Sequence, residues 1–361
     1  METAKKIKFN YNGKLKIMHV TDTHLKHNSK LGGAIWSLEQ ACDIENPDIV
    51  MITGDNVVDC KNPYEVKQLI NTLMSVFESR NIPVAVCFGN HDAETGGMTK
   101  EELMAHYNTF SCSVSVDEGE SLSGCGTYNI PVFSSNGDKV KFNLWVFDSG
   151  DYDEKHRYSC VRADQIEWYK EMSKKLKEEN GGEVVNSFAF QHIIVAEIYD
   201  ALKKVTSWQP YAFKHLYNKK DYYMFNPECV NYGTMKEYPC PGFYNFGQFD
   251  AMVEMGDVLA LFTGHDHTNG FGVRYNGVDI FTSLSNQYGY RVIELDENDT
   301  FTYKTRVVHW FDVFTFRFVK ENKGKYSYEF AIKGKIQKII SNSYRSIVEK
   351  LTGRKVTYPD Q

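Results

Sequence analysis

The sequence predicts an α/β protein whose strands are mostly parallel and are covered by helices on both faces. Three observations support this fold class. Short apolar runs alternate with longer amphipathic segments, which is the order typical of βαβ units. Each run is nearly free of polar residues until its last positions, as expected for strands buried on both sides. No internal repeat or linker interrupts the 361 residues, which favours a single domain, residues 1–361.

The first part of the chain alternates strands and helices. The apolar run KLKIMHVTD predicts the first strand, and a helical pattern follows through AIWSLEQACDI. In YEVKQLINTLMSVFESR, apolar residues recur at spacings of three and four, which predicts a second, amphipathic helix. The strands predicted in this part are residues 14–22, 48–55 and 83–92.

The same alternation continues further along the chain. Strands are predicted at 140–149, 184–192 and 257–267, with a helix that Asp164 opens and that runs through QIEWYKEMSKKLKEE. A loop-rich insertion at about 200–250 is rich in Tyr, Pro and Gly, and insertions of this size often form functional lids or binding loops. Hairpin-type strands are then predicted at 272–283, 290–308 and 312–319, before a C-terminal helix at about 333–353.

Composition excludes some classes of protein. The net charge of −6 argues against nucleic acid as the main partner, because such proteins usually carry a basic surface. No apolar run is long enough for a transmembrane segment, and the N-terminus lacks the apolar core of a signal peptide. We therefore expect a cytoplasmic protein, although a secreted or lysosomal protein without its signal peptide would have the same sequence features. Cys229 and Cys240 lie in the insertion and could pair if the protein is exported.

Residues able to bind metal ions follow the ends of the predicted strands. The carboxyl ends of parallel strands meet at one edge of a sheet, so these side chains are expected to converge. Taken singly, Asp22 or Asp55 could be a helix N-cap, His192 a core histidine, and Asn90 part of a turn. All these alternatives would have to hold together at successive strand ends. The residues, in chain order, are Asp22 and His24, then Asp55, then Asn90, His91 and Asp92, then His192, and finally His265 and His267.

These donors are too many for a single ion with four or five ligands. Nitrogen and oxygen donors in this number suit two first-row transition metals that share a bridging carboxylate. We therefore expect two divalent ions from among Mn, Fe and Zn. Gly54 precedes Asp55 and would let the chain turn closely under them.

The order of these motifs resembles that of the calcineurin-like metallophosphoesterases. TDTH, TGDN, GNHD, FQH and GHDH match the family pattern in order from residue 22 to 267. The segments GHDHTNGFG and SNQYGYR resemble most closely the small purple-acid-phosphatase-related group, typified by yeast Dcr-two-type phosphatases. The resemblance implies a four-layer αββα sandwich of two mixed β-sheets flanked by helices, with the metals at their shared edge.

The resemblance also implies roles for individual residues. One ion would be held by Asp22, His24, Asp55 and His267, and the other by Asp55, Asn90, His192 and His265. His91 would be the catalytic histidine near the leaving group, and Asp92 would orient it. The chain departs from true purple acid phosphatases at Val58, where those enzymes have the tyrosine that ligates ferric iron. We therefore expect no purple charge-transfer band.

The implied reaction is hydrolysis of a phosphate monoester, on a phosphoprotein or a small phosphorylated metabolite, by direct attack of a metal-bridging hydroxide. The alternatives are a phosphodiesterase acting on nucleotide or lipid-headgroup diesters and a non-catalytic scaffold with the same fold. Asn286, Tyr288 and Arg291 follow the last metal motif and are candidates for substrate binding. Arg291 would recognise a second anionic group, or it is an ordinary strand arginine with a surface partner. The sequence leaves the oligomeric state open.

Overall fold

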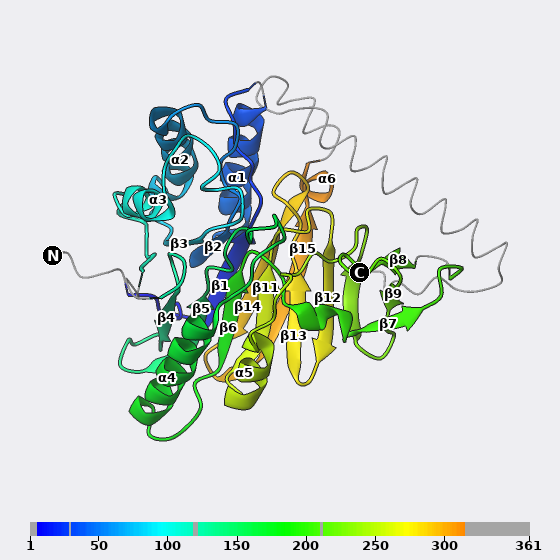
Figure 1. The fold of residues 1–361 in the computed structure, drawn as a ribbon. Coiled ribbons are helices and arrows are strands. Elements are labelled where there is room, and N and C mark those ends of the chain that lie inside the picture. Colours follow the sequence, from blue (N-terminus) through cyan, green and yellow to red (C-terminus); the bar gives the residue numbers. More distant parts are fainter. Residues whose placement is uncertain (1–5, 29, 118–121, 210–211, 315–361) are drawn as a thin grey trace.

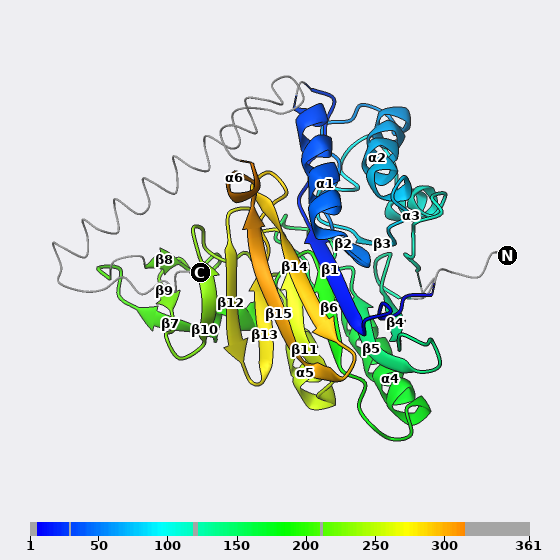
Figure 2. The same ribbon diagram turned by 180° about the vertical axis from the view of Figure 1, so that it is seen from behind.

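The computed structural model describes residues 6–28, 30–117, 122–209 and 212–314. Two large mixed sheets pack against each other, with helices on their outer faces (Figures 1 and 2). The five-stranded sheet has the order β15 (Asp299–His309), β14 (Gly289–Asp296), β1 (Lys14–Val20), β2 (Ile49–Thr53), β3 (Val84–Cys87). The seven-stranded sheet has the order β10 (Val230–Thr234), β12 (Gly270–Tyr275), β13 (Val278–Thr282), β11 (Val258–Thr263), β6 (Ser187–Gln191), β5 (Val140–Val146), β4 (Tyr128–Phe133).

Helices cover both sheets from outside. The helices on the side of the five-stranded sheet are α1 (Leu31–Glu45), α2 (Pro63–Glu78) and α3 (Lys100–Tyr107), and those on the side of the seven-stranded sheet are α4 (Ala163–Glu179) and α5 (Gln248–Met255). The sequence patterns did not indicate α3, a short helix that begins at a capping box formed by Thr99 and Glu102. The predicted fold class, an αββα sandwich, is confirmed.

The alternation of side chains along a strand separates three layers of core. In β1, Leu15 and Ile17 pack between the two sheets, whereas Met18 and Val20 pack against the helices. In β11, Phe262 lies between the sheets and Leu261 lies under the helices. Both faces of these strands are therefore buried, which explains their nearly continuous apolar sequences.

Parallel pairing brings the functional strand ends to one edge. β1, β2 and β3 are parallel to one another, as are β5, β6, β11 and β13. β14 and β15 form the antiparallel hairpin predicted from the sequence, and β14 pairs with β1. The carboxyl ends of β1, β2, β3, β6 and β11 are followed by the loops that carry the candidate ligands.

The insertion contains more regular structure than expected. A three-stranded sheet of β7 (Leu202–Val205), β9 (Tyr222–Phe225) and β8 (Phe213–Lys214) lies beyond β10 in Figure 1, after the short 3₁₀ helix η1 (Ala196–Tyr199). Cys229 and Cys240 are both free thiols in this structure.

The end of the described chain differs from the sequence prediction. A strand was expected at 312–319, but its first two residues belong to the short helix α6 (Trp310–Val313). The rest of that segment and the helix expected at about 333–353 lie outside the described residues. Within the described ranges, no helix has the length and apolar character needed to cross a bilayer.

Candidate metal centre

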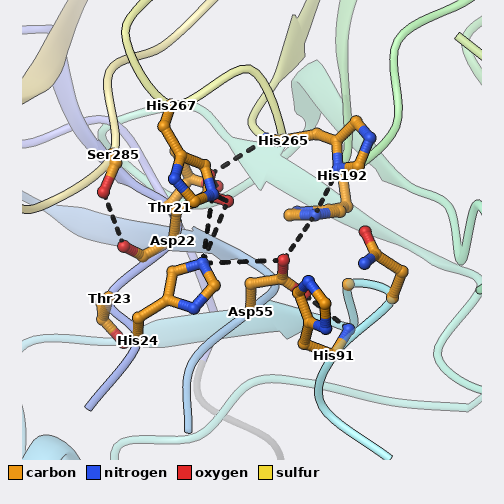
Figure 3. A network of polar contacts seen from close by, with 12 residues as sticks. Thr21, Asp22, Thr23, His24, Asp55, His91, His192, His265, His267 and Ser285 are labelled. Atoms are coloured by element: carbon orange, nitrogen blue, oxygen red, sulfur yellow. Dashed lines mark hydrogen bonds and ion pairs between the residues drawn. The ribbon is translucent and has the colours of Figure 1, made fainter. Parts of the chain in front are cut away.

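Side chains from five strand ends meet at the shared edge of the two sheets (Figure 3). Asp22 and His24 follow β1, Asp55 follows β2, and His192 follows β6. His265 and His267 follow β11, and all six point toward one another in Figure 3. The predicted convergence of these residues is therefore present in the structure.

The first group of donors contains Asp22, His24, Asp55 and His267, whose ligand atoms all lie within 4.8 Å of one another. Nε2 of His267 lies 3.2 Å from Oδ1 of Asp22 and 3.2 Å from Nε2 of His24. Nε2 of His24 is 3.7 Å from Oδ2 of Asp55. These are the four residues expected to hold one ion.

The second group contains Asp55, His192 and His265. Nε2 of His192 is 3.2 Å from Oδ2 of Asp55 and 3.3 Å from Nδ1 of His265. Asn90 is buried in the loop after β3, where its Nδ2 donates to the Tyr152 hydroxyl at 2.7 Å. Asp55 is shared by the two groups, as expected of a bridging ligand.

Each aspartate uses one oxygen to hold the loops and keeps the other for the centre. Oδ2 of Asp22 accepts from the His265 N–H at 3.0 Å, and Oδ1 of Asp55 accepts from the His91 N–H at 2.8 Å. The remaining oxygens, Oδ1 of Asp22 and Oδ2 of Asp55, are buried and accept no hydrogen bond from the described residues. Oδ1 of Asn90 is likewise buried without a partner in the described part of the chain.

Three orphaned oxygens, on Asp22, Asp55 and Asn90, are a test of whether the residues fit metal ions. A buried polar atom without a partner costs about 1–3 kcal/mol, so three in one place require an explanation. All three belong to residues of the predicted ligand set, and each is a lone-pair donor that a divalent cation accepts. His265 presents its Nδ1 to the same centre. The donor set therefore fits two divalent ions.

The hydrogen bond made by His192 and the charges around it also support binding of cations at this centre. Nδ1 of His192 donates to the Thr53 carbonyl at 2.7 Å, so Nε2 is the ring nitrogen that faces Asp55 and the centre. Burial opposes charge on His192, but the carboxylates of Asp55 and Asp22 raise its pKa to about 10. Burial lowers the pKa of His265 to about 3. The concentrated negative field around Asp55 thus attracts a positive charge into the centre.

The loops that carry the ligands are conformationally unusual. Asp22, His24, Asp55 and His265 all have positive φ, at 51°, 43°, 53° and 69°. Non-glycine residues in this region cost of order 1 kcal/mol each, and they cluster at functional sites. Gly54 permits the closest approach, because a Cβ there would lie 2.3 Å from the backbone nitrogen of Gly89.

The structure differs from expectation at Asp92. Its carboxylate accepts from the backbone N–H groups of Asp55, Asn56 and Gly89 at 2.7–2.8 Å, so it clamps two loops together. Nδ1 of His91 instead pairs with Oε2 of Glu94 at 2.5 Å. Glu94 therefore occupies the position expected of Asp92. Its spacing of three from His91 was the only signal in the sequence.

The three candidate substrate-binding residues separate in the structure. Asn286 is buried at the wall of a cavity beside His24, and Tyr288 is half-buried. Arg291 is fully buried, with its guanidinium donating to the Thr282 carbonyl at 2.7 Å and to Ser283 Oγ at 2.9 Å. Both expectations for Arg291, a second anionic group of the substrate and a surface partner, are therefore wrong, because Arg291 is an interior strand arginine.

Two tyrosines next to the centre were not predicted. Tyr152 contacts Asn90, and the ring of Tyr158 meets the His265 ring edge-on, with 4.3 Å between centroids. They lie in the loop between β5 and α4, whose sequence GDYDEKHRYS has no periodic signal. Their proximity to the centre depends on how that loop folds back.

Comparison with known proteins identifies the class to which the fold and the centre belong. The model of the calcineurin-like phosphoesterase family matches residues 15–269, and this chain belongs to that family. The resemblance deduced from the five motifs is confirmed.

The chain is also similar to individual proteins of known name or structure. The chain is 25% identical over 312 residues to the Arabidopsis thaliana protein named "Probable inactive purple acid phosphatase 29", covering 76% of this chain and 72% of that one. It is 28% identical over 189 residues to phosphatase DCR2 of Saccharomyces cerevisiae, covering 46% of this chain and 31% of that one. A dimetal phosphatase from Danio rerio has the same fold, with a TM-score of 0.50 and 12% identity over 82% of this chain and 99% of that one.

Proposed function

We propose that this protein is a two-metal phosphatase that hydrolyses phosphate monoesters on a small phosphorylated metabolite or a phosphoprotein. The observation that carries the proposal is the set of three buried oxygens, on Asp22, Asp55 and Asn90, that have no partner among the described residues. The chain that carries these atoms belongs to the calcineurin-like phosphoesterase family. Two divalent ions held there would neutralise phosphate oxygens and lower the pKa of a bound water.

The proposed ligand sets follow the two groups of donors. Asp22, His24, Asp55 and His267 hold one ion, and Asp55, Asn90, His192 and His265 hold the other. Asp92 keeps the loops of Asp55 and Asn90 in register through its three backbone hydrogen bonds. Mn, Fe and Zn all suit this mixture of carboxylate, amide and imidazole ligands.

His91 is the proposed proton donor to the leaving group. Its ring centroid is 5.8 Å from that of His24, and its side chain is 39% exposed, so a substrate can reach it. Because Glu94 pairs with Nδ1, Nε2 is the ring nitrogen that would face the leaving oxygen. General-acid catalysis of this kind contributes about 10²–10⁴-fold to rate.

The word "inactive" in the name of the Arabidopsis relative raises the alternative of a non-catalytic scaffold. Each residue of the proposed ligand set is present in this chain, and His91 is also present. Retention of the complete set favours catalysis. A phosphodiesterase would use the same centre, so the alternatives are separated by activity and metal content.

The test compares p-nitrophenyl phosphate with bis-p-nitrophenyl phosphate in the presence of Mn, Zn, Fe or no added metal. Asp55→Asn removes the bridging carboxylate, and we expect it to lower kcat/KM at least about 100-fold, since even indirect metal contacts are worth 10–100-fold. Asp200→Asn is the matched control, because Asp200 is exposed and belongs to neither group of donors. The monoester should be the better substrate.

Three other results would contradict different parts of the proposed function. Faster diester hydrolysis would replace the monoesterase by the phosphodiesterase. Absence of turnover and of bound metal in the same samples would sink the enzyme proposal and favour the scaffold. Equal losses of kcat/KM in the two Asp variants would contradict the proposal that Asp55 is the bridging carboxylate.

A further inference from the structure

The cavity that has Asn286 at its wall opens beside the candidate metal centre, on the side of His24. It has a volume of about 230 Å³ and lies between the loop after β1, the first turn of α1 and the loop that carries Asn286. We call it the α1 cavity and define it by Lys26, Lys30, Gly33, Asn286 and Trp310. His24 lines it as well, so the cavity adjoins the first group of metal donors.

The charges around the α1 cavity favour an anion. Two lysines, Lys26 and Lys30, line it, and Lys26 also pairs with the exposed carboxylate of Asp59 at 2.9 Å. The described residues of the lining itself include no aspartate or glutamate. The 15-residue helix α1 begins there without a side-chain cap and without an acidic residue in its first turn. The partial positive charge of the helix N-terminus is therefore not neutralised by its own sequence.

Asn286 provides an independent sign of a missing ligand. Its side chain is 3% exposed, and Oδ1 has no hydrogen-bond partner among the described residues. Its backbone N–H donates to the Thr21 carbonyl at 2.8 Å, which fixes the residue next to the strand end that carries Asp22. Rotation of the amide by 180° would present Nδ2 in place of Oδ1, so the group can donate to an anion or accept from a protonated one.

We propose that the α1 cavity binds the second phosphate group of a small bisphosphorylated substrate whose first phosphate occupies the metal centre. This inference rests on the proposed function and specifies its substrate class. A cavity of about 230 Å³ has room for a phosphate group and a short carbon chain. Lys26, Lys30 and the first turn of α1 supply the positive charge, and the Asn286 amide supplies a directed hydrogen bond. This subsite takes the role that the sequence assigned to Arg291.

The first experiment isolates the effect of the second phosphate. The substrates are the bisphosphates of linear three-, four- and six-carbon diols, each compared with the matching monophosphate. We expect kcat/KM to favour at least one bisphosphate. In Lys26→Gln/Lys30→Gln this preference should fall roughly tenfold or more, since hydrogen bonds to charged groups contribute at that level. Lys174→Gln/Lys175→Gln on α4 changes the net charge equally at exposed positions and should retain the preference.

The second experiment does not depend on turnover. Inorganic sulfate is titrated calorimetrically into the metal-loaded full chain, and we expect the wild type to bind one more sulfate than Lys26→Gln/Lys30→Gln. Asn286→Ala should weaken this additional site. An unchanged preference for bisphosphates together with equal sulfate stoichiometry would overturn the subsite. If neither ester is hydrolysed but the sulfate difference persists, the proposed function fails while the anion site stands.

Discussion

The exposed carboxylate of Glu94 contacts His91, the proposed proton donor of the centre. It pairs with Nδ1 of His91, but the two side chains are 49% and 39% exposed. Water weakens ion pairs at such exposure to about 0–1 kcal/mol. Its influence on His91 is therefore expected to lie in orientation of the ring.

We predict that Glu94→Gln lowers kcat for p-nitrophenyl phosphate no more than about tenfold, because glutamine keeps an acceptor for Nδ1 and the pair is weak. His91→Ala should lower kcat by about 10²–10⁴-fold. Steady-state kinetics that separate kcat from KM check this, with Glu167→Gln on the exposed face of α4 as control. Equal losses in Glu94→Gln and His91→Ala would show that Glu94 does more than orient the ring.

A second prediction at the residue scale concerns Val58. This half-buried residue donates its backbone N–H to the Leu25 carbonyl at 2.9 Å and offers no phenolate. Burial raises the pKa of Tyr152, the tyrosine next to Asn90, to about 12, so it remains a phenol at neutral pH. We expect no visible charge-transfer band when the protein is loaded with ferric iron and measured by absorption spectroscopy. A band that disappears in Tyr152→Phe would mean that Tyr152 reaches the iron.

At the scale of elements, the loops after β2 and β3 approach so closely that only glycine fits between them. Gly54 has φ of 86°, and a Cβ there would meet the backbone of Gly89 at 2.3 Å. Gly277, in the turn between β12 and β13, has the same φ of 86°, but a Cβ there would meet nothing within 4 Å. The two positions share their backbone strain and differ in available space.

We predict that Gly54→Ala destabilises the protein by several kcal/mol more than Gly277→Ala. The shared left-handed conformation should cost each variant roughly 1–2 kcal/mol, and only Gly54→Ala must also push two loops apart. Urea denaturation of both variants measures the difference. Similar free energies of unfolding would mean that the loops of Asp55 and Asn90 separate easily.

At the scale of the whole molecule, a buried polar chain joins the two sheets behind the centre. His19 in β1 lies 2.7 Å from Thr53 Oγ1 and 2.9 Å from Ser283 Oγ, which follows β13 in the other sheet. Arg291 in β14 donates to the same Ser283 oxygen at 2.9 Å. Arg291 thus contributes to the packing of the two sheets.

The burial of His19 in this polar network makes the free energy of unfolding depend on pH in a defined direction. Burial, with a further contribution from Arg291, lowers the pKa of His19 from 6.5 to about 3. The folded protein therefore keeps His19 neutral while the unfolded chain binds a proton below pH 6.5. The stabilisation from neutral His19 is present above about pH 6.5 and is lost as pH falls toward 3.

We predict that His19 lowers the free energy of unfolding by roughly 1.4 kcal/mol for each unit by which the pH falls between 6.5 and about 3. His19→Gln should be less stable at pH 7 and should show a shallower dependence below pH 6.5. Urea denaturation at a series of pH values provides the measurement. His27→Gln, which changes an exposed histidine, is the control. An unchanged slope in His19→Gln would contradict the assignment.

Most of the fold and most of the candidate ligand set could be predicted from the sequence. Strands such as β1 and β11 are buried on both faces, so their apolar runs are long and their ends are marked by the first polar residues. The chemistry of the donors is also local, because Asp22, His24, His265 and His267 follow those strand ends directly. The elements missed include α3 and α5, which are short, strand β4, and the small sheet of the insertion, whose aromatic residues carry no clear period.

The sequence by itself determined the type of fold, the edge of the sheets at which the donors collect, and the chemical identity of those donors. These follow from hydrophobic periodicity and from residue type, which are properties of neighbouring residues. Only the tertiary structure decided that Glu94 pairs with His91, that Arg291 is buried between the sheets, and that the α1 cavity adjoins His24. Those outcomes depend on where loops distant in sequence cross one another, and periodicity contains no information about such crossings.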